Sequence, residues 1–264
     1  MSRTETDGTG RSPRVLRGRG ELARLRDENA ALRRRLAALE GRTDLGYLFV
    51  LTYGRSGSTL LQGVLNSIPG YLIRGENRQM MRLLYDYHRT GMEARRVQRK
   101  VMRRLTGTKT PTDPTRPFFG MDGYPSKRSI AGFRRLALDT ILRPEEDTRV
   151  IGFKEIRWTK EDLGDFVAWL RQVFPDARFV VNTRNHDDVS KSMWWADDPT
   201  APERLERAEA RLLATAADLG DAAYHVRYDD YVADPAALAP FFAWLGEPFD
   251  EEQVRAVLAV RHSR

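Results

Sequence analysis

A short polar stretch at residues 55–59, RSGST, gathers a fixed cation, three hydroxyl groups and a glycine. These groups suit an oxyanion, because guanidinium and hydroxyl groups donate hydrogen bonds and glycine lets the backbone approach closely. An apolar run at residues 47–51 precedes the stretch, and apolar residues follow it at helical spacing, namely Leu60, Leu61, Val64 and Leu65. The unpaired N–H groups and the dipole of the helix N-terminus add to an anion site. The stretch therefore predicts a strand, a tight binding loop and a helix.

The order of residues in this loop does not fit the common nucleoside-triphosphate pattern. That pattern, G-x-x-x-x-G-K-[ST], has lysine after its second glycine, whereas here Arg55 precedes the glycine. The segment TYGRSGSTLL instead resembles the 5′-phosphosulfate loop of sulfotransferases that use 3′-phosphoadenylyl sulfate (PAPS), and it is closest to bacterial carbohydrate and tyrosylprotein sulfotransferases. The cytosolic small-molecule branch of the family has lysine at the position of Arg55 and tryptophan at the position of Leu60. The resemblance spans about residues 47–246 and implies donor contacts from Arg55, Ser56, Gly57, Ser58 and Thr59.

A second segment, TRNHDDVSKS at residues 183–192, resembles the sulfotransferase segment that binds the 3′-phosphate of the nucleotide. The resemblance implies that Arg184 and Ser192 bind this phosphate, with His186 in place of a proline. An arginine fork suits a dianion, and an intervening helix places the serine on the same face two turns later. Tyr228 resembles the family's tyrosine near adenine, although a tyrosine packed in the core fits the sequence equally well.

A carboxylate is expected beside the loop, because an acceptor hydroxyl must lose its proton as it attacks sulfur. Glu76 follows an expected strand and resembles the glutamate of the tyrosylprotein and bacterial pattern, so it is the predicted base. Glu155 is the rival base, since it also stands at a strand end. An ion pair of Glu76 with Arg74 or Arg78 is the purely structural alternative.

Two positive charges are expected to assist the transfer. Lys154 resembles the catalytic lysine that stabilises the bridging oxygen in the tyrosylprotein branch, and Arg55 adds a second cation. Sulfuryl transfer needs positioning and charge neutralisation more than covalent chemistry. The sequence contains no His/Asp cluster at metal-ligand spacing, so we expect no metal.

Apolar strands alternate with amphipathic helices along residues 44–264. The expected strands are 47–51, 71–73, 150–153, 178–182 and 224–228, and the expected helices after the loop helix are 80–105, 129–142, 160–174, 202–219, 235–245 and 250–260. This alternation predicts an α/β fold, a parallel sheet with helices on both faces, and the resemblance implies that it is P-loop-like. Ligands bind at the carboxyl ends of such strands, where the polar clusters fall. The Pro-, Gly- and Thr-rich segment 106–126 is expected to form a lid on the acceptor side.

Composition indicates one substantial core with an appendage, since 264 residues are 41% hydrophobic. Residues 1–43 hold eleven arginines against six acids, so they carry +5 of the net charge of +7 and leave +2 for the rest. A balanced domain with a basic tail does not indicate a nucleic-acid partner. The chain has no cysteine, no apolar run of the ~18 residues that a membrane span needs and no signal-peptide core. We therefore expect a cytoplasmic protein without a membrane span.

The N-terminal residues divide into two expected parts. Residues 1–20 are expected to be a disordered basic tail. Residues 21–43 are expected to form a coiled-coil helix, with a and d positions at Leu22, Leu25, Asn29, Leu32, Leu36 and Leu39. Asparagine at an a position and complementary g–e′ charges favour a parallel homodimer. A helix that docks its leucines on the catalytic domain is the alternative.

Together these features predict a PAPS-dependent sulfotransferase, with residues 44–264 as its catalytic domain. The acceptor is expected to be a small molecule or carbohydrate with a hydroxyl group, and a lipid, a natural product or a peptide tyrosine remain open. A P-loop-type nucleotide kinase is the alternative enzyme, but the chain lacks the GK[ST] sequence. A coiled-coil scaffold with an inactive nucleotide-binding fold is the alternative from another class.

Overall fold

The computed structural model describes residues 21, 24, 25, 27, 28, 44–107 and 114–260. The contacts of the chain divide it into two units, Met1–Thr43 and Asp44–Arg264. The described residues of the first unit are helical. The predicted disordered tail and all the predicted heptad positions except Leu25 lie outside the described residues, so the coiled coil stays a prediction.

A five-stranded parallel sheet forms the centre of the second unit, and this confirms the predicted α/β fold. The strand order is β2-β3-β1-β4-β5, and the strands are β1 (Gly46–Leu51), β2 (Tyr71–Arg74), β3 (Val150–Glu155), β4 (Arg178–Thr183) and β5 (Ala223–Arg227). The binding loop thus leaves the central strand, whose neighbours are β3 and β4. Observed strand ends differ from the predicted ones by up to two residues.

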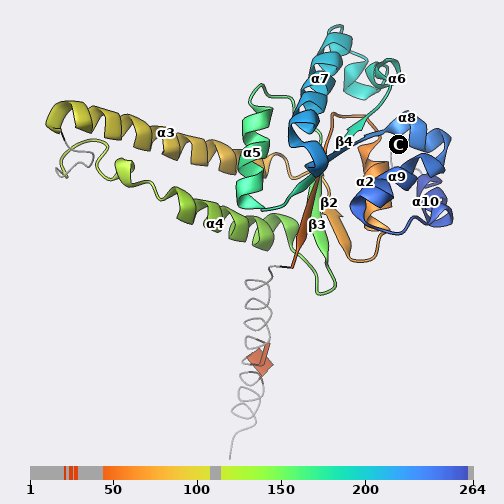
Figure 1. Ribbon diagram of the computed structural model, residues 1–264, viewed down its shortest axis with the longest axis horizontal. Helices are drawn as coiled ribbons and strands as arrows, with labels where there is room; N and C mark the ends of the chain where they lie inside the picture. The colour runs from red at the N-terminus through yellow and green to blue at the C-terminus, as the bar shows by residue number, and fades with distance from the viewer. Residues whose placement is uncertain (1–20, 22–23, 26, 29–43, 108–113, 261–264) are drawn as a thin grey trace, which may run out of the picture. The chain divides into compact units, whose positions relative to one another are not determined.

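Helices cover both faces of the sheet (Figure 1). They are α2 (Ser58–Asn66), α3 (Met80–Thr106), α4 (Ser126–Ala137), α5 (Leu163–Val173), α6 (His186–Ser190), α7 (Ala201–Leu219), α8 (Tyr228–Ala233), α9 (Ala239–Leu245) and α10 (Glu251–Leu258). A π-helical segment, η2 (Leu138–Leu142), continues α4, and 3₁₀ turns include η1 (Met121–Gly123), η3 (Met193–Trp195) and η5 (Pro235–Leu238). Each helix predicted from the sequence is present in the structure, with ends that differ from the predicted ones.

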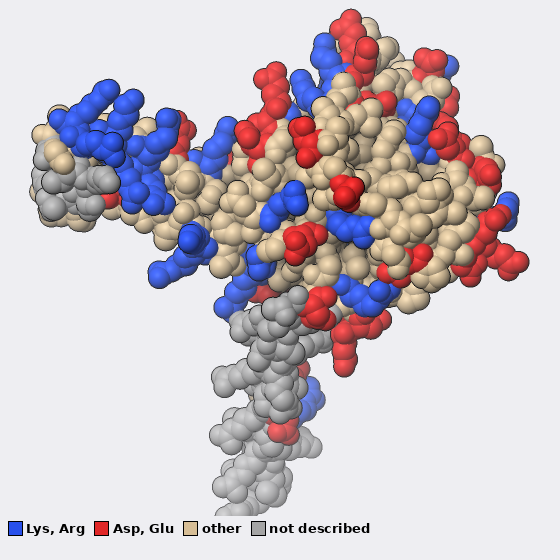
Figure 2. Space-filling model, in the orientation of Figure 1, with Lys and Arg blue, Asp and Glu red and all other residues tan. Residues whose placement is uncertain are grey.

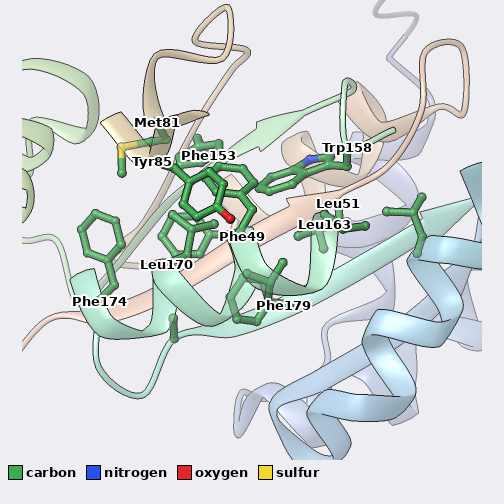
Figure 3. Close-up of a cluster of buried hydrophobic side chains, with 14 of the residues drawn as sticks. Phe49, Leu51, Met81, Tyr85, Phe153, Trp158, Leu163, Leu170, Phe174 and Phe179 are labelled. Carbon is green, nitrogen blue, oxygen red and sulfur yellow. The ribbon is translucent and has the colours of Figure 1, made fainter. Parts of the chain in front are cut away.

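The apolar run of β1 is buried on both faces because successive side chains point to opposite sides of a strand. Phe49 and Leu51 join the hydrophobic cluster beneath α3, α4, α5 and α7, which Figure 3 shows with aromatic side chains such as Phe153. Leu48 and Val50 join the cluster on the other face, with α2, α8, α9 and α10. Burial of both faces fixes the direction in which β1 delivers the loop.

The segment predicted as a lid is described only in part, and the lid stays a prediction. Its described part, residues 114–126, includes η1, which lies against α3, and Arg99 Nε donates a hydrogen bond to the carbonyl oxygen of Asp122 at 3.1 Å. Tyr124 packs on Gly91, where a Cβ atom would lie 2.5 Å from its ring. None of residues 114–126 lines the cleft described below. Of its aromatic side chains, Tyr124 packs on α3, whereas Phe118 and Phe119 are exposed.

Candidate active site

The binding loop joins β1 to α2 through two residues with positive φ, Arg55 at 70° and Gly57 at 77°. Two features require glycine at position 57. Its positive φ favours glycine, and an added Cβ atom would lie 2.0 Å from the ring of Tyr228. Its carbonyl oxygen accepts the first bonds of the helix from the N–H groups of Leu60 and Leu61. No side chain caps the N-terminus of α2. The first turn therefore offers backbone donors at the position that the sequence predicted for an anion.

Buried polar side chains support this loop from behind. The Ser56 and Thr52 hydroxyl groups are 2.6 Å apart, and Thr52 donates to the carbonyl oxygen of Asn182 at 2.6 Å. The Asn182 amide in turn donates to the carbonyl oxygen of Ser56 at 2.8 Å and accepts from the Tyr231 hydroxyl at 3.0 Å. Ser56, predicted to contact the donor, is fully buried and is not part of the cleft wall. In this structure its side chain shapes the loop.

The sequence reasoning missed Thr52, Asn182 and Tyr231, and for the first two a signal existed. Thr52 directly follows β1 and Asn182 lies near the end of β4, which pairs with β1. Polar residues at the ends of buried strands must find partners, since an unpaired buried group costs about 1–3 kcal/mol. Two such residues on neighbouring strands are therefore candidates for one network.

Arg184 lies beneath the loop and faces Tyr228. Its Nη1 donates to the carbonyl oxygen of Arg55 at 3.3 Å, and its guanidinium carbon is 4.5 Å from the centre of the Tyr228 ring. Its Nε is buried and has no hydrogen-bond partner among the described residues. A buried guanidinium N–H without an acceptor is costly in a protein that binds nothing there, and an anionic ligand would satisfy it.

The backbone of Arg184 is held in place by a tyrosine. The Tyr53 hydroxyl accepts from the Arg184 N–H at 2.9 Å and lies 2.7 Å from Glu209 Oε2, to which it can donate. Burial, followed by the hydrogen bond to Glu209, raises the pKa of Tyr53, so this phenol stays protonated at neutral pH. Tyr53 therefore fixes the backbone from which the arginine projects.

Ser192 contacts the binding loop, by a different route from the one predicted, and does not itself line the cleft described below. The helix after Arg184 is only five residues long and ends at Ser190, so the argument from two helical turns is wrong. Ser192 instead accepts a hydrogen bond from Arg55 Nε at 2.8 Å. The loop and the segment 183–192 are thus joined directly by their two predicted anion-binding residues.

Glu76 and Lys154 form an ion pair beside the loop. Lys154 Nζ lies 2.7 Å from Glu76 Oε1, with 6% of the lysine side chain and 38% of the glutamate side chain exposed. Glu155 points elsewhere, because neighbouring residues of β3 face opposite sides of the sheet. Its buried carboxylate accepts from the backbone N–H groups of Gln79 at 3.1 Å and Ile156 at 2.9 Å. Glu76 is therefore the carboxylate that faces the cleft, and Glu155 organises the backbone before α3.

A cleft with a volume of about 330 Å³ brings these groups together. Eight predicted residues line it, namely Arg55, Gly57, Ser58, Thr59, Glu76, Lys154, Arg184 and Tyr228. The sequence reasoning did not assign the remaining lining residues, which are Leu60, Ile156, Trp194, Leu258 and Val260. Trp194 lies against Gly54, where a Cβ atom would be 2.6 Å from its ring. Three cations, Arg55, Lys154 and Arg184, thus share a cleft with apolar side chains, as in many small-molecule sites.

Within the described residues, no three His, Cys, Asp or Glu side chains are grouped to hold a metal ion. The described helices also include none that is long and apolar enough to cross a membrane.

The fold and the cleft define a class: a parallel α/β protein with a cation-lined cleft next to the loop that follows its central strand. Residues 48–251 match the sequence model of the Sulfotransferase family, and the chain belongs to that family. The predicted sulfotransferase identity is therefore confirmed.

Two solved structures are similar to the chain. One is the sulfotransferase domain from the curacin biosynthetic pathway, with a TM-score of 0.46 and 15% identity over 79% of this chain and 76% of that chain. The other is sulfotransferase STF9 from Mycobacterium avium, with a TM-score of 0.46 and 16% identity over 89% of this chain and 73% of that chain. No curated protein matches the chain. Family membership thus rests on the sequence match.

Proposed function

We propose that this sulfotransferase takes its sulfuryl group from PAPS and transfers it to a hydroxyl group of a carbohydrate, lipid or natural product. One observation carries the proposal: the uncapped N-terminus of α2, the two arginines and the Glu76–Lys154 ion pair line a single cleft. The expected cytoplasmic location and the absence of a metal requirement belong to the same proposal.

The positions of the side chains support the proposed donor-binding roles. Arg55, Ser58 and Thr59, together with the backbone N–H groups of the loop, would hold the phosphosulfate. Arg184 would hold the 3′-phosphate, since its buried Nε has no acceptor among the described residues. Ser192 would share that phosphate while it orients Arg55 through their hydrogen bond. Tyr228 would lie beside the adenine, with its ring fixed by Arg184 and Gly57.

The transfer step uses the ion pair. The acceptor oxygen forms a bond to sulfur while the bond from sulfur to the bridging oxygen of the 5′-phosphate breaks, and the hydroxyl proton passes to a Glu76 oxygen. As Glu76 becomes neutral, Lys154 loses its anionic partner and can donate to the bridging oxygen, where negative charge develops. The two residues are 2.7 Å apart, which supports coupling of the proton transfer at Glu76 to the charge on Lys154. The products are the sulfate ester and adenosine 3′,5′-bisphosphate.

Binding of adenosine 3′,5′-bisphosphate tests the donor assignment without knowledge of the acceptor. Arg184→Ala should weaken binding by at least about 2 kcal/mol, because it removes charge-assisted bonds to a phosphate. Isothermal calorimetry measures this loss, with the exposed Arg207→Ala on α7 as the matched control. If Arg184→Ala binds the bisphosphate as tightly as the unchanged protein, the assignment of the 3′-phosphate site is wrong. Stabilisation by ATP rather than by PAPS in thermal unfolding would instead favour a kinase.

A further inference from the structure

A helical arm projects from the sheet and contains a surface that the catalytic cleft does not use. The arm consists of α3, α4 and the described residues 114–125 between them, and its two helices lie side by side in Figure 1. Arg99 Nε donates to the carbonyl oxygen of Asp122 at 3.1 Å, and Arg95 Nη1 donates to that of Tyr124 at 3.4 Å. These bonds tie residues 122–124 to the outer half of α3. The arm therefore presents a defined surface.

Positive charge is concentrated on the outer half of α3. Residues 89–104 contain seven Lys and Arg residues and one acid, whereas residues 44–264 as a whole have a net charge of only +2. Lys100, Arg103 and Arg104 are exposed, and no carboxylate of the described residues lies within ion-pair distance of them. Figure 2 shows Lys and Arg side chains gathered at this end of the arm. Since the remainder of the domain is net acidic, this end differs electrostatically from the rest.

Large apolar side chains are exposed at the same end. Phe118 is 58% exposed and Phe119 is 49% exposed, and Met121 and Leu105 are also exposed. Residues 118–124 run antiparallel to α3, because Tyr124 packs on Gly91 while Asp122 meets Arg99. Phe118 and Phe119 therefore lie towards the C-terminal end of α3, near the basic residues. We call Lys100, Arg103, Arg104, Leu105, Phe118, Phe119 and Met121 the tip surface.

We propose that the tip surface docks the protein on an anionic lipid membrane. Aromatic side chains beside clustered Lys and Arg residues are what binding to an interface needs, since the rings enter the headgroup layer and the cations meet acidic lipids. Lys and Arg side chains can also extend their charged groups along an apolar surface. A soluble polyanion without aromatic groups would use the charge but would leave the exposed phenylalanines and methionine unexplained. The proposal is independent of sulfuryl transfer.

Vesicle co-sedimentation of the full-length chain tests the proposal. The protein should pellet with phosphatidylcholine vesicles that contain phosphatidylserine and should remain in the supernatant with phosphatidylcholine alone. The triple variant Lys100→Glu, Arg103→Glu, Arg104→Glu should lose at least about tenfold in lipid partitioning. The matched control reverses three exposed arginines on α5, α7 and α10, namely Arg171→Glu, Arg207→Glu and Arg255→Glu. Both triples change the net charge equally and keep the basic N-terminal residues, so only a tip-specific loss supports the proposal.

A second variant separates the lipid contact from charge attraction. Phe118→Ser with Phe119→Ser should reduce partitioning several-fold at unchanged net charge, and the residual binding should then be removed by salt more readily. The proposal would be overturned if the triple variant Lys100→Glu, Arg103→Glu, Arg104→Glu bound anionic vesicles as well as the unchanged protein does. It would also be overturned if the unchanged protein bound neutral and anionic vesicles equally well. If the protein does not bind anionic vesicles but binds heparin or a single-stranded oligonucleotide through the same residues, the partner is a soluble polyanion and the membrane proposal is wrong.

Discussion

Two carboxylates at or just after the ends of the neighbouring strands β2 and β3 have different surroundings in this protein. Glu76 is partly exposed and paired with Lys154, whereas Glu155 is buried and accepts two backbone N–H groups. A base must reach the acceptor oxygen, while a carboxylate occupied by backbone donors is held in a structural role. The geometry therefore favours Glu76 for the chemical step and gives Glu155 the task of fixing the chain before α3.

Substitution of the two glutamates separates these roles. Glu76→Gln keeps the shape but removes the basicity, so turnover should fall by about 10²–10⁴-fold. Its affinity for adenosine 3′,5′-bisphosphate should change little, because the phosphate contacts are untouched. Glu155→Gln is the matched control and should reduce turnover much less.

The measurement is the rate of product formation with an accepted hydroxyl substrate, with calorimetry on each variant as a check of nucleotide binding. If Glu155→Gln proves to be the crippled variant and Glu76→Gln stays active, Glu155 is the base. The sulfotransferase assignment would survive that result, since it rests on the family match.

At the scale of elements, α3 is anchored to the chain that precedes α5. Arg82 is buried and forms a paired contact with Asp162, with Nη1–Oδ1 and Nη2–Oδ2 distances of 2.7 and 2.6 Å. The hydrogen bonds from Arg82 lower the pKa of Asp162 in the folded protein. This contact fixes the first turns of α3, which follow directly after Glu76, so it also stabilises the segment that presents the proposed base.

Loss of this contact should be visible in stability and its pH dependence. Asp162→Asn should lower the free energy of unfolding at neutral pH by about 2 kcal/mol, as expected for hydrogen bonds between charged groups. Because the pKa of Asp162 is lowered on folding, its contribution is present above the usual Asp range near 3.8 and is lost as the pH falls through the folded-state value. The difference between the two proteins should therefore shrink in acid.

Urea unfolding at several pH values measures this difference. The exposed neighbour Glu161→Gln is the control and should have little effect. A difference between Asp162→Asn and the unchanged protein that stays constant down to the lowest pH would show that the carboxylate charge is not what stabilises the fold.

At the scale of the whole molecule, the hydrophobic core that the structure describes lies in the unit Asp44–Arg264. Every buried residue of the two clusters belongs to the unit Asp44–Arg264, and the family match begins at residue 48. The first 43 residues supply the predicted heptads and +5 of the net charge. Their proposed task is self-association through a parallel coiled coil.

Deletion of residues 1–43 should therefore weaken self-association and leave the catalytic domain folded. Sedimentation velocity over a range of concentrations measures the first effect, and thermal unfolding measures the second. The substitution Asn29→Leu is a useful companion, because an apolar a position should strengthen association and relax its two-stranded preference. A full-length protein that remains monomeric at high concentration would mean that the leucines pack elsewhere.

Much of the site could be predicted from the sequence because its signals are local. An apolar run, a glycine-containing loop and an amphipathic helix specify a βα turn, and alternation of such units places the strand ends at one edge of a parallel sheet. The sequence thus determined that the loop 55–59, Glu76, Lys154 and Arg184 would meet. Eight of the predicted residues line one cleft.

Only the tertiary structure decided which side chains face the cleft and which stand behind it. Only the family resemblance ranked Glu76 above Glu155; periodicity alone could not separate them, since that choice depends on the face that β3 turns to the loop. Nor could it show that Ser56 lies within a buried network, or that Arg55 bonds to Ser192, 137 positions further along the chain. The period of two in a strand shows that successive side chains point to opposite faces of the sheet. Which of the two faces lines the cleft depends on how elements distant in the sequence pack together.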